Sequence, residues 1–307
     1  MKVTIETSII GNGVPRWEDE IRTVDPAVVV TGAEGLTNFS KISPAAADAC
    51  IYCGSNEYGR TREHVIAYAL GGDVTIPKGS CRACQKITHK FETAVLRGPM
   101  QMVRYIQRLP SRTKHQEAPQ IVSLFVTING IETTVDVPAD KAPILLAFPT
   151  FEAPSYLHGG SSNLRLNGLV TGSYGVDPES FVRGLGAESM RLTSPGNAPV
   201  AFAQMVAKTA YANAYIQKQL HRVKDTNPLV RAMLYEPNSI GRFVGTLPEP
   251  YLKREGVQHY LGIHELSAER VLYATVQLFA GSGAPIYVVV LGDLRDVDTQ
   301  QIVASDI

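Results

Sequence analysis

Four cysteines constrain the fold of this chain more than any other feature. They form two C-x-x-C pairs, Cys50 with Cys53 and Cys81 with Cys84, and no other cysteine occurs in the 307 residues. Each C-x-x-C turn can present two sulfurs to one ion, and tetrahedral zinc takes four soft ligands of this kind. Disulfides are disfavoured because the N-terminus, MKVTIETSIIGNG, lacks the apolar core and cleavage site of a secretory signal. We therefore expect one structural zinc ion bound by the four cysteines.

The composition indicates a globular protein. Hydrophobic residues make up 44% and charged residues 19%, so the chain can bury a core and does not belong to the disordered class. No apolar stretch approaches the roughly 20 residues that cross a bilayer, so we expect a cytoplasmic protein with no membrane partner. The 29 basic residues balance the 29 acidic residues. The charge of the whole chain therefore indicates no partner, and any basic surface must be local.

Hydrophobic patterning predicts an α+β fold in three segments. Residues 1–49 are expected to hold short strands and a linker. Residues 50–98 are expected to form a small module framed by the cysteines, which we call the finger. Residues 99–307 are expected to form a larger mixed α+β domain with antiparallel strands, and the sequence does not indicate its role.

Individual elements can be placed within these segments. The clearest hairpin is expected at residues 121–137, because alternating β-formers flank Asn129-Gly130, a pair that suits a type I′ turn. A long helix is expected over residues 198–222, with an apolar stripe facing a core. Further helices are expected at 85–96, where Ile87, Phe91 and Val95 share a stripe, at 99–109 and at 228–236, and strands at 143–149, 164–174, 259–266, 270–279 and 285–293.

Between the two cysteine pairs lies TREHVIAYALGG, residues 61–72. After the second pair, Gln85 and His89 are four residues apart on an expected helix, so their side chains share one face. Closure of the zinc site would bring Glu63 against that face. Carboxylate, amide oxygen and imidazole would then surround one divalent ion, with His64 beside it, which is a hydrolytic arrangement. Gly71-Gly72 is expected to make a turn that a side chain would oppose.

This order of motifs resembles the HNH endonuclease family, in the variety whose ββα-metal finger is braced by four cysteines. The resemblance covers residues 48–98 and rests on C-x-x-C, on EHVI with an Ala-Leu-Gly-Gly turn, and on C-R-A-C followed by a polar residue and a helix. It implies a metal-dependent endonuclease that hydrolyses phosphodiester bonds. His64 would be the general base, and Glu63, Gln85 and His89 would bind a catalytic Mg²⁺ or Mn²⁺.

Two positions depart from the family's pattern. Gln85 stands where Asn or His is usual, and its extra methylene moves the carbonyl oxygen by about 1.5 Å. The loop GGDVTIPKGSC lacks the asparagine that normally steadies the histidine. A backbone carbonyl or Thr75 could orient His64 instead.

Basic residues gather in and after the finger, which favours a phosphate-backbone substrate. The partner expected is nucleic acid, with DNA favoured, and the oligomeric state is not indicated. The residues expected to contact nucleic acid are Arg62, Lys86, Lys90, Arg97, Arg104 and Arg108.

Two other functions stay open. The first is a zinc-braced nucleic-acid-binding module without catalysis, favoured by Gln85 and by the missing asparagine. The second is a regulator that senses a small ligand through its C-terminal domain, with the finger as output or scaffold.

Overall fold

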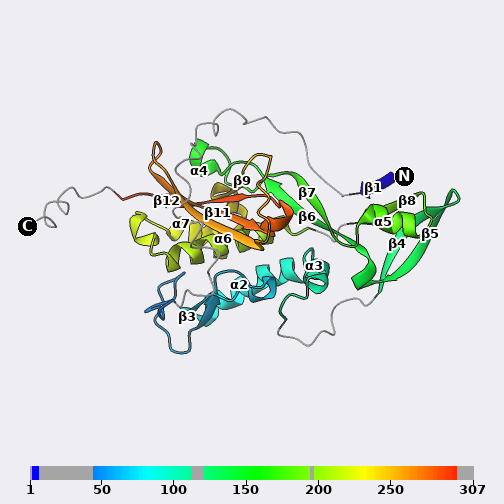
Figure 1. Cartoon of the computed structure of the whole chain (residues 1–307). Helices are drawn as coiled ribbons and strands as arrows, with labels where there is room; N and C mark the ends of the chain where they lie inside the picture. Colours follow the sequence, from blue (N-terminus) through cyan, green and yellow to red (C-terminus); the bar gives the residue numbers. More distant parts are fainter. Residues whose placement is uncertain (1, 7–43, 112–120, 194–196, 296–307) are drawn as a thin grey trace, which may run out of the picture.

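The structure, a computed structural model, describes residues 2–6, 44–111, 121–193 and 197–295 (Figure 1). Within these ranges the chain is a mixed α+β protein, as the sequence predicts, and most of its strand pairs are antiparallel. Strand β1 (Lys2–Glu6) instead pairs in parallel with β8 (Ser189–Thr193). The other short strands expected before residue 49 fall in residues 7–43, outside the described residues.

The finger is a hairpin followed by a helix. Strands β2 and β3 pair antiparallel, with Glu63 opposite Ile76 and His64 opposite Thr75. Helix α2 buries Phe91 and Val95, as its spacing predicts, whereas Ile87 is half-buried. The finger and the short helix after it comprise β2 (Thr61–His64), the 3-10 turn η3 (Tyr68–Leu70), β3 (Thr75–Ser80), α2 (Arg82–Leu96) and α3 (Gln101–Ile106).

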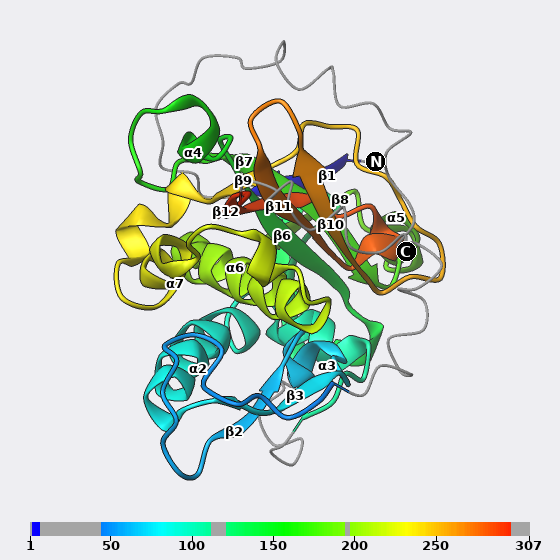
Figure 2. The same cartoon turned by 90° about the vertical axis from the view of Figure 1, so that its left-hand side faces the viewer.

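Helix α6 (Pro199–Ile216) lies between the finger and a four-stranded antiparallel sheet (Figure 2). The sheet has the order β10-β11-β12-β9. One hydrophobic core runs from the finger through α6 into this sheet, so the three layers share one interior. The elements around α6 are α7 (Asn227–Leu234), β9 (Val244–Thr246), β10 (His259–Leu266), β11 (Val271–Leu278) and β12 (Tyr287–Asp293).

Helix α6 is shorter than predicted and is buried all round. It ends at Ile216 rather than near residue 222, and the chain turns at Lys218, whose φ is 56°. The predicted stripe is buried from Phe202 to Ala212 and half-buried at its last residue, Ile216. Gln204 and Lys208, on other faces, are buried as well. The prediction of one buried face was incomplete, because the sheet covers one side of α6 and the finger covers the opposite side.

A second sheet lies away from the finger, at the right of Figure 1, in the order β1-β8-β4-β5. The predicted hairpin at its edge is confirmed, and Asn129 and Gly130 have φ of 51° and 75°, as a type I′ turn requires. A separate small core packs this sheet against α5. The elements are β4 (Ile121–Ile128), β5 (Ile131–Pro138), α5 (Pro178–Gly184) and the long connecting pair β6 (Pro143–Phe151) and β7 (Leu166–Gly175).

The remaining elements are short connections between these layers: η4 (Ala139–Lys141), α4 (Ser155–His158), η5 (Leu220–Arg222), η6 (Pro237–Arg242) and η7 (Ala280–Ser282). Among the helices of the described ranges, none has the length and apolar character needed to cross a membrane.

Candidate functional site

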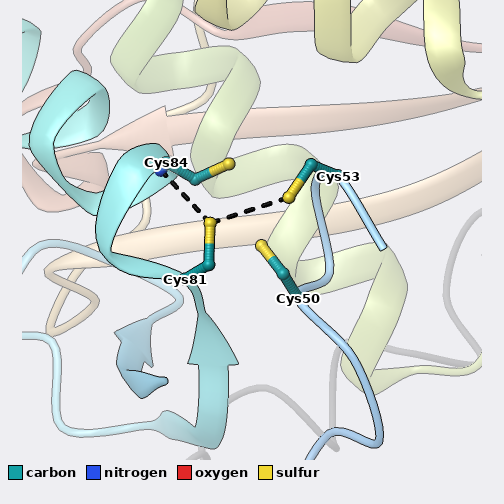
Figure 3. A group of neighbouring side chains, drawn as sticks. All are labelled: Cys50, Cys53, Cys81 and Cys84. Atoms are coloured by element: carbon teal, nitrogen blue, oxygen red, sulfur yellow. Dashed lines mark hydrogen bonds between the residues drawn. The ribbon is translucent and has the colours of Figure 1, made fainter. Parts of the chain in front are cut away.

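The four cysteines converge at one end of the finger (Figure 3). Their Sγ atoms all lie within 4.8 Å of one another, and the Sγ atoms of Cys53 and Cys81 are 3.6 Å apart. A tetrahedral ion with metal–sulfur bonds of 2.3 Å would separate its sulfurs by roughly 3.8 Å. Three of the cysteines are buried, Cys53 is exposed, and all four are free thiols. The cluster can therefore hold a metal ion.

Local backbone geometry arranges the cysteines. Cys81 caps the N-terminus of α2, where its Sγ accepts a hydrogen bond from the Cys84 N–H at 3.4 Å. The main-chain N–H of Ile51 donates to the carbonyl of Gly79 at 2.9 Å, which fixes the first cysteine pair against β3. A hydrogen bond from the Cys84 thiol lowers the pKa of Cys50, against the opposing effect of burial, and the same bond raises the pKa of Cys84. The pair thus favours a thiolate, the form of cysteine that binds metal, at Cys50.

His64 ends β2 and is oriented by the turn that follows. Its Nδ1 lies 3.3 Å from the carbonyl oxygen of Gly72. A carbonyl can only accept, so neutral His64 carries its proton on Nδ1 and its basic lone pair on Nε2. Of the two groups that the sequence offers for steadying this histidine, the structure places a backbone carbonyl in that position.

The Gly71-Gly72 turn is built as the sequence predicts. Gly71 has a φ of 89°, in the left-handed region that favours glycine. A Cβ on Gly72 would lie 2.0 Å from the carbonyl oxygen of Ile66, so close an approach that no side chain fits there.

Beside this turn is a cleft of about 270 Å³ between the hairpin and α2. The four residues predicted for catalysis and for binding the catalytic ion line it: Glu63, His64, Gln85 and His89. The His64 ring packs against Tyr68, with 5.6 Å between ring centroids. His89 is exposed, and its Nε2 lies 3.4 Å from Thr93 Oγ1. Among the described residues, only the cysteine cluster brings together three or more His, Cys, Asp or Glu at metal-binding spacing.

Glu63 has a partner that the sequence analysis did not include. Its carboxylate is buried and lies 2.7 Å from the Nζ of Lys208, on α6. The same ammonium lies 3.0 Å from Glu92 Oε1 and donates to the main-chain carbonyl of His64 at 2.5 Å. The sequence did carry a signal for this partner, because Lys208 is the one charged residue of the apolar helix sequence PVAFAQMVAKTAYANAYI.

The ionisation of this cluster follows from its burial and its charges. Burial alone would lower the pKa of Lys208, but the carboxylates of Glu63 and Glu92 together raise it above its usual range. Burial also raises the pKa of Glu63, and the nearby Lys208 charge opposes that rise. Lys208 is therefore a charged ammonium in the wall of the cleft.

The basic residues predicted to contact nucleic acid divide into two groups. Arg62, Arg97 and Arg104 line the cleft, whereas Lys86, Lys90 and Arg108 are exposed outside its lining. Arg104 also has a structural role. Its guanidinium donates to the carbonyls of Ala69 and Leu96, both at 2.8 Å, and so ties the turn after β2 to the end of α2.

The fold and the site define a mixed α+β protein with a four-cysteine cluster that can hold a metal ion and an adjoining cleft that presents a histidine. No protein-family model, curated protein or solved structure matches the chain.

Proposed function

We propose that the protein is a metal-dependent endonuclease of the HNH type, which hydrolyses phosphodiester bonds in nucleic acid, with DNA as the favoured substrate. One observation carries the proposal. His64 ends the first strand of a ββα unit, its Nδ1 is bonded to a backbone carbonyl, and it lines the same cleft as Gln85 and His89. An imidazole held in this way presents Nε2 as a proton acceptor.

The cysteine cluster is proposed to hold a structural Zn²⁺. Four protein thiolates fill a tetrahedral ion and leave no position open for substrate or water, which is typical of structural zinc. Reduced thiols also suit the cytoplasm, the location we propose. Metal analysis of freshly purified protein should find about one zinc per chain. Metal-free protein with four titratable thiols would refute this assignment.

The residues of the cleft would share the catalytic work. Gln85, through its amide oxygen, and His89, through its imidazole, would hold a Mg²⁺ or Mn²⁺ ion. Such an ion supplies charge stabilisation at the phosphate when it is bound. Glu63 is the third ligand expected from the sequence, and in that role its carboxylate would have to weaken its ion pair with Lys208.

The other residues would act on water and on the substrate backbone. His64 would take a proton from the attacking water at Nε2. Arg62 and Arg97 would attract the phosphate backbone toward the cleft.

One observation favours a second function. The Glu63 carboxylate is paired with Lys208, which leaves Gln85 and His89 as the ligands of the ion. If those two ligands hold the ion too weakly for catalysis, the finger would bind nucleic acid without cutting it. A plasmid-nicking assay with Mg²⁺ or Mn²⁺ separates the two functions. Wild type should nick supercoiled DNA, and His64→Ala should be slower by roughly 10²- to 10⁴-fold, the scale for removing a general base.

The matched control is His158→Ala, which removes an exposed histidine away from the cleft. It should nick at the wild-type rate. Equal rates for wild type and His64→Ala under single-turnover conditions would refute His64 as the base. If wild type and all variants bind DNA but none nicks it, the binding module would be favoured.

A further inference from the structure

Lys208 joins the C-terminal domain to the cleft. It lies in the middle of α6, its side chain is 1% exposed, and it reaches the wall of the cleft that His64 also lines. A lysine this deeply buried must have its charge compensated by the groups around it.

Two carboxylates and one carbonyl compensate the charge, and the contact with Glu92 is an ion pair, since Glu92 Oε1 has no hydrogen-bond partner. An ammonium has three N–H donors. Around Nζ lie three oxygens, from the carboxylates of Glu63 and Glu92 and from the main-chain carbonyl of His64, at 2.7, 3.0 and 2.5 Å. The contact with the carbonyl also fixes the backbone of the proposed general base.

These three oxygens are also the ligands that a hard divalent cation prefers. Binding of an ammonium and a divalent ion to the Glu63 carboxylate at the same time is unfavourable in free energy, because two positive charges a few ångströms apart in a buried site repel each other. The Glu63 carboxylate that a divalent ion would need already has its Oε1 2.7 Å from the Nζ of Lys208.

We propose that the ammonium of Lys208 is the cation that pairs with Glu63 and Glu92 in the folded protein. The ammonium and a divalent ion would therefore compete for the Glu63 carboxylate. This inference deepens the proposed function and rests on it for the ion at Gln85 and His89. It makes Lys208 a positioning residue of the cleft, and it assigns Glu63 to Lys208 rather than to that ion.

The test measures Mn²⁺ binding to the full-length, zinc-loaded protein by calorimetric titration, with no nucleic acid present. The single variant Glu63→Gln should have nearly the same Mn²⁺ affinity as wild type. Lys208→Met, which removes the ammonium and frees two carboxylates, should raise the affinity by about tenfold or more. Adding Glu63→Gln to Lys208→Met should remove that gain, because the ion loses a direct ligand.

Two controls complete the design. Lys86→Met removes an exposed lysine from α2 and should leave Mn²⁺ binding as in wild type. Lys208→Arg keeps a cation at the cluster and should not gain affinity. A Lys208→Met protein that folds only when Mn²⁺ is supplied would also support the proposal, since the ion would then replace the ammonium.

Three results would overturn it. The first is a wild-type Mn²⁺ affinity that falls about tenfold or more on Glu63→Gln, since Glu63 would then already bind the ion. The second is folded Lys208→Met with no gain in affinity. The third is Lys208→Met that stays unfolded with Mn²⁺ present while Lys208→Arg folds. Failure of the proposed function would give another result: the Mn²⁺ affinities would change as expected, but neither wild type nor any variant would cut DNA.

Discussion

Arg62 lies on β2 with its side chain in the wall of the cleft, whereas Lys86 is exposed on α2 outside that wall. Both residues have the charge to contact phosphate, so charge alone does not distinguish them. Their positions distinguish them, because a nucleic-acid backbone that reaches His64 must pass the residues that line the same cleft.

This difference predicts the salt dependence of DNA binding. Arg62→Gln should weaken binding to all sequences alike and lower the slope of log affinity against log salt by about 0.9, the value for one lost phosphate contact. The charge of Lys86 also predicts a contact with nucleic acid, but Lys86 lies outside the cleft, so Lys86→Gln serves as the matched control and should keep the wild-type slope. Binding titrations at several salt concentrations measure both. Equal slopes for wild type and Arg62→Gln would show that DNA does not enter this cleft.

At the scale of residues, the sequence predicted the cysteine cluster but missed the partners of His64 and Glu63. The C-x-x-C spacing is local, and so the metal cluster could be predicted. The hydrogen bond from His64 to Gly72 could not, because any residue offers a carbonyl and only the turn decides where it points. Lys208 could not be placed beside Glu63, because the two are joined by the packing of α6 on the finger and by no sequence pattern.

The turn between β2 and β3 is the element that sets the position of His64. Gly72→Ala would place a Cβ 2.0 Å from the Ile66 carbonyl, so the backbone must shift and the Gly72 carbonyl would leave Nδ1. We expect a loss of about 3 kcal/mol in the free energy of unfolding, the upper range for overpacking, together with reduced nicking. Urea unfolding and single-turnover nicking measure the two effects.

Gly184→Ala, at the end of α5, is the control, because nothing lies within 4 Å of the added Cβ. Its stability should change by less than about 1 kcal/mol. Wild-type stability in Gly72→Ala would mean that the turn relaxes freely and does not hold His64.

At the scale of elements, the sequence succeeded where the signal is local. Asn129-Gly130 specifies its turn, and most of the predicted strands and helices occur near the expected residues. The exceptions depend on packing between distant segments. The parallel pairing of β1 with β8 and the burial of α6 on every side are set by neighbours that no short window contains.

At the scale of the whole molecule, His259 on β10 is a second link between the four-stranded sheet and the finger. Its Nδ1 accepts from the Phe279 N–H at 3.2 Å, so its Nε2 carries the proton and donates to the Leu70 carbonyl at 2.7 Å. Both bonds together require the neutral imidazole. Burial lowers the pKa of His259, and the bond to Leu70 partly opposes that effect.

The sign of the pH dependence follows. A histidine whose pKa is lower in the folded state contributes stability above its unfolded pKa of about 6.5, and this is lost as the pH falls through the folded pKa. The stability difference between wild type and His259→Gln should therefore be largest near neutral pH and should shrink on acidification. Urea unfolding at several pH values from neutral to mildly acidic measures it. Parallel profiles for the two proteins would show that His259 does not titrate with folding.

The position of Lys208 so late in the chain has a consequence for biosynthesis. At about 5–20 residues per second, the ribosome completes the finger roughly ten seconds before it adds Lys208. During that interval Glu63 and Glu92 have no ammonium, and the main-chain carbonyl of His64 lacks its donor. Nascent chains that end before α6 should therefore exchange the amide hydrogens of β2 faster than the complete protein. Ordering of the proposed nuclease site would then wait for the C-terminal half of the chain, because the main-chain carbonyl of His64 gains its donor only when α6 is made.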